Sequence, residues 1–198
     1  MIRLPDRIEP NFLLQAYSMG IFPMADDEGR ISWYSPDPRA ILEHADLQVS
    51  RSLRSVVRKG TYVVRFDTAF ERVMRECAAP RTDERGTWIT EEFIETYTTL
   101  HRHGFAHSVE AWHGDMLVGG LYGVSIGAAF MGESMFSRMP NASKVCLVKL
   151  VERLQARGYQ LHDTQFLTPH LERLGAKLIS RDEYTRRLQQ SIQVPCSL

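Results

Sequence analysis

The chain has 198 residues, of which 43% are apolar and 24% are charged. Lys plus Arg and Asp plus Glu number 24 each, so the formal net charge is zero. These values are typical of a globular chain that buries a core in one domain of ordinary size, and they exclude a disordered, fibrous or uniformly basic protein. Any contact with a nucleic acid must therefore come from a local concentration of charge.

The cysteines and the N-terminus indicate the cellular setting. Cys77, Cys146 and Cys196 are odd in number, far apart and in no Cys-x-x-Cys pair. This pattern is typical of a reduced intracellular protein with neither a disulfide framework nor a zinc knuckle. The N-terminus lacks the apolar core of a signal peptide, and no stretch approaches the roughly 20 apolar residues that span a bilayer. We therefore expect a cytoplasmic protein with no membrane segment and no bound metal.

The first forty residues predict a small N-terminal unit. Residues 11–19 predict a short helix that Asn11 caps and Gly20 ends. The stretch 23–38, rich in Pro, Asp and Gly, predicts a loop that links this unit to the main body. The expected division is therefore a unit over 1–40 and a main domain over 41–198.

Residues 50–66 predict an amphipathic helix followed by a strand. The helix covers 50–59 and ends at Gly60, and the alternating run 62–66 predicts the strand. Two further helices are expected over 70–77 and from Thr90 to about residue 101.

The second half predicts an antiparallel meander and then alternating helices and strands. Three short strands with tight turns form the meander. Ser143 is the expected cap of the next helix, and Gly158 its stop. The expected elements are strands 108–112, 116–124 and 128–133, helix 142–157, strand 159–166, a helix from about Thr168, strand 177–180 and a helix from Arg181. This order favours an α/β (α+β) fold with a mixed, largely antiparallel sheet over a doubly wound parallel one.

Three polar residues have the surroundings of a functional site. Asp163 and Gln165 lie two apart on a predicted strand and so point to the same face, beside apolar neighbours. Glu133 lies between the apolar residues Met131 and Met135, which is not typical of a solvated surface carboxylate. The alternatives stay open: Asp163 ends its strand and caps the next turn, or Glu133 forms a structural ion pair with Arg138 or Lys144.

The helix predicted over 50–59 carries a cluster of basic residues with no acidic residue nearby in the sequence. No acidic residue occurs between Asp46 and Asp67. One basic face on a neutral protein suits contact with a phosphate backbone, although an ordinary solvated helix face has the same pattern. The basic residues in question are Arg51, Arg54, Arg58 and Lys59.

An ordered set of motifs resembles the leucyl/phenylalanyl-tRNA–protein transferases over nearly the whole chain, from Tyr17 to about Leu188. The chain looks like a short form that lacks the N-terminal extension of some members. The motifs are Gly20-Ile21-Phe22-Pro23, Ser35-Pro36-Asp37-Pro38-Arg39-Ala40, Ser50-Arg51-Ser52, Gly86-Thr87-Trp88-Ile89-Thr90, Ala106-His107-Ser108-Val109-Glu110, Leu117-Val118-Gly119-Gly120, Gly132-Glu133-Ser134-Met135-Phe136-Ser137-Arg138, Asn141-Ala142-Ser143-Lys144 and Asp163-Thr164-Gln165.

The resemblance implies a GNAT-like acyltransferase fold and an aminoacyltransferase activity without a cofactor. Such an enzyme takes Leu or Phe, and Met less well, from aminoacyl-tRNA. It attaches that residue to the N-terminal amine of proteins that begin with Arg or Lys and so marks them for degradation by the N-end rule pathway. We expect a monomer.

The resemblance also assigns residues. Asp163, Gln165 and Glu133 fall on catalytic positions. Trp88 and Met24 fall on positions that contact the terminal adenosine, and the four basic residues of helix 50–59 on positions that bind the tRNA. The aminoacyl pocket would consist of Leu121, Phe130, Met135, Ser137, Leu147, Leu150, Leu154 and His162.

A mechanism follows as a hypothesis. The donor is an activated ester, so the enzyme must chiefly align it with an amine. Asp163 would polarise Gln165, which holds the attacking amine, and would accept the proton directly or through water. Glu133 would orient the acceptor and attract its cationic side chain.

Two positions depart from the family, and two other functions compete. Met24 stands where long members carry Trp, and His162 stands where the pocket is aliphatic elsewhere. An acyl-CoA N-acyltransferase would need a Gly-rich loop at a helix N-terminus, whereas residues 137–143 contain no glycine and Pro140 lacks an N–H. An RNA-binding adaptor would keep the basic helix without needing Asp163 and Gln165.

Overall fold

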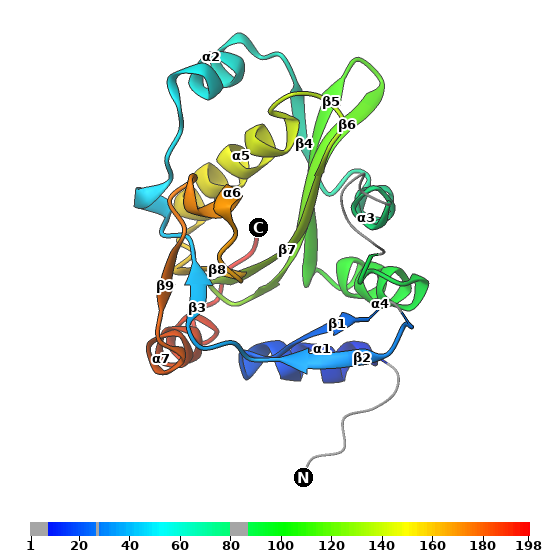
Figure 1. The fold of residues 1–198 in the computed structure, drawn as a ribbon, viewed down its shortest axis with the longest axis vertical. Coiled ribbons are helices and arrows are strands. Elements are labelled where there is room, and N and C mark those ends of the chain that lie inside the picture. Colours follow the sequence, from blue (N-terminus) through cyan, green and yellow to red (C-terminus); the bar gives the residue numbers. More distant parts are fainter. Residues whose placement is uncertain (1–7, 27, 80–86) are drawn as a thin grey trace.

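A seven-stranded sheet runs through the molecule and carries helices on both faces (Figure 1). The structure is a computed structural model that describes residues 8–26, 28–79 and 87–198. The strand order is β4-β5-β6-β7-β8-β3-β9, and only the neighbours β7 and β8 are parallel. The predicted mixed, largely antiparallel α/β fold is confirmed. The strands of this sheet are β3 (Arg39–Ile41), β4 (Val63–Phe66), β5 (Ala106–His113), β6 (Met116–Ile126), β7 (Ala129–Ser137), β8 (Leu161–Gln165) and β9 (Lys177–Ile179).

The helices divide the core into two halves. One cluster of buried side chains lies between the sheet and α1, α3 and α4, and the other between the sheet and α5 (Figure 1). No helix among the described residues is long and apolar enough to cross a membrane. The helices are α1 (Pro10–Ser18), α2 (Arg51–Lys59), α3 (Phe70–Ala78), α4 (Glu91–Arg102), α5 (Ala142–Arg157), α6 (Pro169–Glu172) and α7 (Arg181–Ser191), with a 3-10 turn, η1 (His44–Asp46).

The strongest sequence patterns predict their elements correctly. The meander β5–β6–β7 forms, and α5 spans the predicted residues. Gly158, with a φ of 82°, ends α5, and the hydroxyl of Ser50 caps α2 by accepting from the N–H of Leu53. The predicted cap of α5 at Ser143 is wrong, because Asn141, with a φ of 66°, is the cap residue and Ser143 lies inside the helix.

The loop predicted over 23–38 is wrong where two strands form. β1 (Phe22–Ala25) and β2 (Ile31–Tyr34) pair as a two-stranded antiparallel ribbon. The turn between them contains Gly29 at a φ of 76°. Strands of four residues, one of which contains Pro23, leave too short an alternation to predict, and packing of Phe22 and Ala25 into the core defines the ribbon instead.

Strand β3 is also absent from the sequence-based expectation, because three residues carry no pattern. It lies between β8 and β9 and so joins the first forty residues to the main sheet. Leu13 and Phe22 share one buried cluster with Met131 of the main sheet. The division at residue 40 stays a prediction.

The N-terminus of α5 lies directly against β6 at a glycine. A Cβ added to Gly119 would lie 2.5 Å from the Cβ of Ala142 and 2.9 Å from its carbonyl carbon. Only a glycine allows this approach, which fixes the start of α5 beside the carboxyl end of β7.

We expect Gly119→Ala to lower the free energy of unfolding by about 1–3 kcal/mol, because backbone atoms of α5 must move. Chemical denaturation measures the change. Gly132→Ala is the matched control, since its nearest contact would be an ordinary 3.5 Å. Equal stabilities for the two variants would contradict this account.

Candidate active site

A cavity of about 1080 Å³ opens between the sheet and α5. It lies at the point where β7 and β8 run side by side and α5 begins. A volume of this size holds a ligand larger than a single amino acid. Residues of β7, β8, α5, α6 and the segment after α3 form its wall.

One side of the cavity is apolar. Seven of the eight residues predicted for the aminoacyl pocket line it. Leu154 does not, because it lies about one turn beyond Leu150 on α5 and is completely buried in the core. The seven are Leu121, Phe130, Met135, Ser137, Leu147, Leu150 and His162.

Glu133 and Gln165 form a hydrogen-bonded pair at this wall. Glu133 lines the cavity, and the side-chain amide of Gln165 donates to its carboxylate at 2.8 Å. Burial raises the pKa of the Glu133 carboxyl to about 8, and a hydrogen bond from Tyr17 offsets part of that effect. The structure thus places an acid that exchanges its proton near neutral pH beside a buried amide.

The Glu133 carboxylate has no ion-pair partner in the described part of the chain. Of the two cations considered from sequence, Arg138 contacts Glu76 at 2.8 Å, and no salt bridge among the described residues joins Lys144 to Glu133. The ion-pair alternative for Glu133 is therefore wrong. Its neighbours are phenols and an amide, since Tyr17 contacts both Glu133 and the hydroxyl of Tyr97.

Asp163 has a different environment from Glu133. It is completely buried and does not line the cavity. Arg39 donates from Nε to Oδ1 at 2.9 Å and from Nη2 to Oδ2 at 2.6 Å. Oδ1 also accepts the backbone N–H of Gln165, and Oδ2 accepts the hydroxyl of Tyr184. Each carboxylate oxygen therefore accepts two hydrogen bonds.

Arg39 and Tyr184 are the residues that sequence reasoning missed. Arg39 stands 124 positions before Asp163, just after the segment predicted as a loop, so no local pattern joins the two. The motif Pro38-Arg39-Ala40 is the one signal in the sequence that could have pointed to Arg39. An Arg next to a buried Ala, and outside any predicted helix, does not lie on a solvated helix face.

The two residues predicted to contact adenosine occupy different places. Trp88 lines the cavity and packs edge-on against Phe93 at 5.4 Å. Met24 does not line the cavity; it packs on the buried cluster of α1 and α4, while its neighbour Ala25 reaches the wall.

The basic helix α2 lies behind α5 as seen from the cavity. Ser143, Leu147 and Leu150 of α5 face the cavity, whereas Val148 and Glu152 face a shallow hollow bordered by α2. These two sets lie on different faces of the helix. The four basic residues are exposed, and none forms a salt bridge within the described residues.

The C-terminal end of α2 nevertheless adjoins the cavity rim. Tyr62, just after α2, donates from its hydroxyl to the carbonyl of Pro140 at 2.8 Å. Pro140 belongs to the loop that begins with the rim residue Arg138. The loop after α2 thus contacts the loop at the cavity rim.

The raised pKa of Glu133 makes stability depend on pH. A carboxyl whose folded-state pKa is about 8 holds a proton that the unfolded chain releases near its usual value of 4.5. The associated stability is complete below the unfolded-state pKa and is lost as pH rises through the folded-state pKa. Glu133→Gln cannot ionise, so we expect denaturation at a series of pH values to show a flatter dependence than in the wild type.

Glu95→Gln, on the exposed face of α4, is the control and should keep the wild-type dependence. If Glu133→Gln also kept it, the carboxyl would not be protonated in the folded protein.

Comparison with known proteins gives one consistent result. The family model described as leucyl/phenylalanyl-tRNA protein transferase matches residues 41–189, and the model of its N-terminal domain matches residues 6–37. A protein named leucyl/phenylalanyl-tRNA–protein transferase from Rubrobacter xylanophilus is 54% identical over 95% of this chain and 97% of its own. One of the same name from Anaeromyxobacter dehalogenans is 54% identical over 95% of this chain and 81% of its own.

Solved structures give lower similarity. A GCN5-related N-acetyltransferase-like protein from Streptococcus suis covers 86% of this chain and 64% of its own at 17% identity, with a TM-score of 0.40. The structure titled L-PGS from Bacillus licheniformis covers 84% and 56% at 12% identity, with a TM-score of 0.41. The two family models together cover most of the sequence. The chain therefore belongs to the leucyl/phenylalanyl-tRNA–protein transferases, enzymes that transfer an aminoacyl group from tRNA to a protein.

Proposed function

We propose that this enzyme transfers Leu and Phe, and Met less well, to the N-terminal amine of proteins that begin with Arg or Lys. It acts as a cytoplasmic monomer in the N-end rule degradation pathway. The observation that carries the proposal is the apolar cavity with the Glu133–Gln165 pair at its wall. The apolar side takes the aminoacyl side chain, and the pair lies where the amine meets the ester.

The reaction does not require a strong base. An α-amine has a pKa of roughly 7.7–8, so a useful fraction is neutral near pH 7. Gln165, whose amide nitrogen donates to Glu133, has its side-chain oxygen left to accept from the attacking amine. Glu133, with a pKa of about 8, is poised to exchange a proton as the amine attacks and the ribose oxygen leaves.

Asp163 takes a positioning role in this proposal. Four donors occupy its two oxygens, so accepting a proton would break the ion pair with Arg39. Its hydrogen bond to the N–H of Gln165 holds that residue at a φ of 61°, a conformation that costs energy for a side chain other than glycine. The strained backbone turns the Gln165 amide toward Glu133.

The loop before α5 argues against acyl-CoA as the donor. The N–H groups of Arg138 and Met139 both donate to the carbonyl of Val118, and that of Ala142 donates to the carbonyl of Met139. The N–H of Ser143 donates to Ser137, and Pro140 has none. Few backbone donors are left to hold a pyrophosphate there.

The activity itself is the first test. We expect radiolabelled Leu and Phe to pass from their tRNAs to a peptide that begins with Arg or Lys, and no acetyl group to pass from acetyl-CoA. Val and Ala should transfer poorly, because a missing methylene costs about 1–3 kcal/mol of pocket binding. Gln165→Ala should lower kcat by about a hundredfold or more with unchanged thermal stability.

A peptide that begins with Ala serves as the control acceptor. Equal transfer to the Arg and Ala peptides would contradict the acceptor assignment, and transfer of Val as fast as Leu would contradict the pocket assignment.

The basic surface on α2 gives a separate prediction. Reversing Arg54 and Arg58 to Glu should raise KM for Leu-tRNA by about tenfold or more, leave kcat nearly unchanged and reduce the salt dependence of binding. Steady-state kinetics at several salt concentrations measure both effects. Arg102→Glu, an exposed reversal at the end of α4, is the control and should leave KM unchanged. A matching rise in KM for the control would indicate a general charge effect rather than a site on α2.

A further inference from the structure

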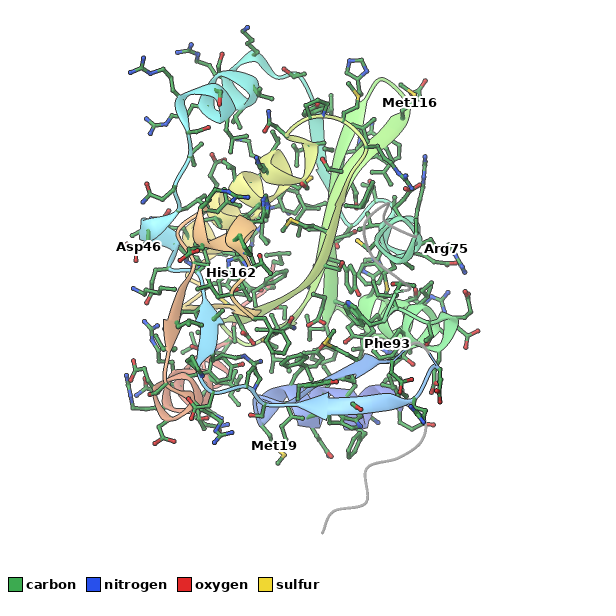
Figure 2. The ribbon with its side chains drawn as sticks, viewed as in Figure 1. Met19, Asp46, Arg75, Phe93, Met116 and His162 are labelled. Atoms are coloured by element: carbon green, nitrogen blue, oxygen red, sulfur yellow. The ribbon has the colours of Figure 1, made fainter. Side chains whose placement is uncertain are left out.

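The wall of the cavity contains a buried histidine. His162 lies on β8 opposite Phe130 of β7, and only 3% of its surface is exposed. Its ring packs edge-on against the Phe130 ring at 5.6 Å. Figure 2 shows His162 in the interior, near α6. Among the apolar residues on this side of the cavity, His162 brings a polar ring to the wall.

The ring is neutral. Burial, with a smaller contribution from the ring of His44, whose centroid lies 6.1 Å away, lowers the pKa of His162 to about 3. A neutral imidazole has one N–H donor and one bare nitrogen that accepts. The chemistry of the cavity therefore depends on which nitrogen carries the proton.

The surroundings of the two nitrogens decide the tautomer. Nδ1 is sealed from solvent and has no hydrogen-bond partner among the described residues. A sealed N–H without an acceptor is the costlier arrangement, since buried donors are almost always paired. The proton therefore resides on Nε2.

Nε2 lies on the side of the ring toward Gly132. A Cβ added to Gly132 would lie 3.6 Å from Nε2, and Gly132 itself lines the cavity. The glycine leaves this edge of the ring uncovered. No hydrogen bond from Nε2 to another described residue occurs, so the donor is left for a ligand.

We propose that His162 offers its Nε2–H to the aminoacyl side chain and thereby makes Met a better substrate relative to Leu than an all-apolar wall would. The inference rests on the proposed function, because it assigns the aminoacyl group to this cavity. Thioether sulfur is a weak acceptor on a flexible side chain, so Met can meet the N–H. A Leu side chain would exclude water from the same donor and has no acceptor to replace the lost hydrogen bond. The ring face of Phe is an intermediate partner.

The test compares kcat/KM for Met-tRNA and Leu-tRNA in the wild type and in His162→Leu. We expect the Met-to-Leu ratio to fall about three- to tenfold in the variant, the loss of one weak hydrogen bond. His162→Gln keeps an N–H donor and should hold the ratio within about twofold of the wild type. An unchanged ratio in His162→Leu, with wild-type thermal stability, overturns the inference.

A second measurement uses the wild-type protein and needs no variant. Nitrogen NMR of the histidines should show His162 with its proton on Nε2, and an amide-linked 3′-methionyl adenosine should shift that signal more than the leucyl analogue does. A proton on Nδ1, or equal shifts with both analogues, overturns the proposal. Failure of the proposed function looks different: the wild type would then transfer none of Leu, Phe and Met to the Arg peptide.

Discussion

The buried ion pair between Arg39 and Asp163 is the interaction on which the site depends. Its two side chains are 1% and 0% exposed, so both charges have left water. Such a pair is tolerable only when every donor and acceptor is satisfied. Arg39 meets that requirement by also donating to the carbonyl of Gly20, while its guanidinium lies between the rings of Phe22 and Tyr184 at 4.7 and 4.4 Å. One interaction thereby joins the N-terminal segment, β3, β8 and α7.

The same pair gives the two acidic residues of the site different environments. Asp163 accepts two hydrogen bonds from the cation Arg39 and two more from the N–H of Gln165 and the hydroxyl of Tyr184. Glu133 accepts hydrogen bonds from a phenol and an amide, and burial, together with the nearby charge of Asp163, raises its pKa to about 8. Two carboxyl groups whose environments differ in this way typically divide structural and proton-transfer work. Gln165 connects them, because its backbone binds Asp163 and its side chain binds Glu133.

Sequence reasoning succeeds here where the pattern is local. The meander, α5 and its end at Gly158 follow from alternation, helical spacing and a single glycine at the helix end. The apolar neighbours of Glu133 also mark it correctly as an atypical surface carboxylate, since it is only partly exposed. Sequence reasoning fails where the determinant is a distant contact: β3 has three residues, and Arg39 finds its partner 124 positions away. The motifs locate Asp163 and Gln165, but only the fold shows that the first binds an arginine and the second a glutamate.

The separation of α2 from the cavity bears on how the proposed reaction achieves selectivity. Basic residues on α2 would hold phosphates, which are alike in every tRNA and carry no sequence information. Discrimination would then lie in the cavity, which in this proposal binds the amino-acid side chain rather than the nucleic acid. An apolar wall separates similar apolar groups weakly. Any sharper preference must therefore come from a polar group in that wall. His162 supplies such a group, and its ring nitrogens have no hydrogen-bond partner among the described residues.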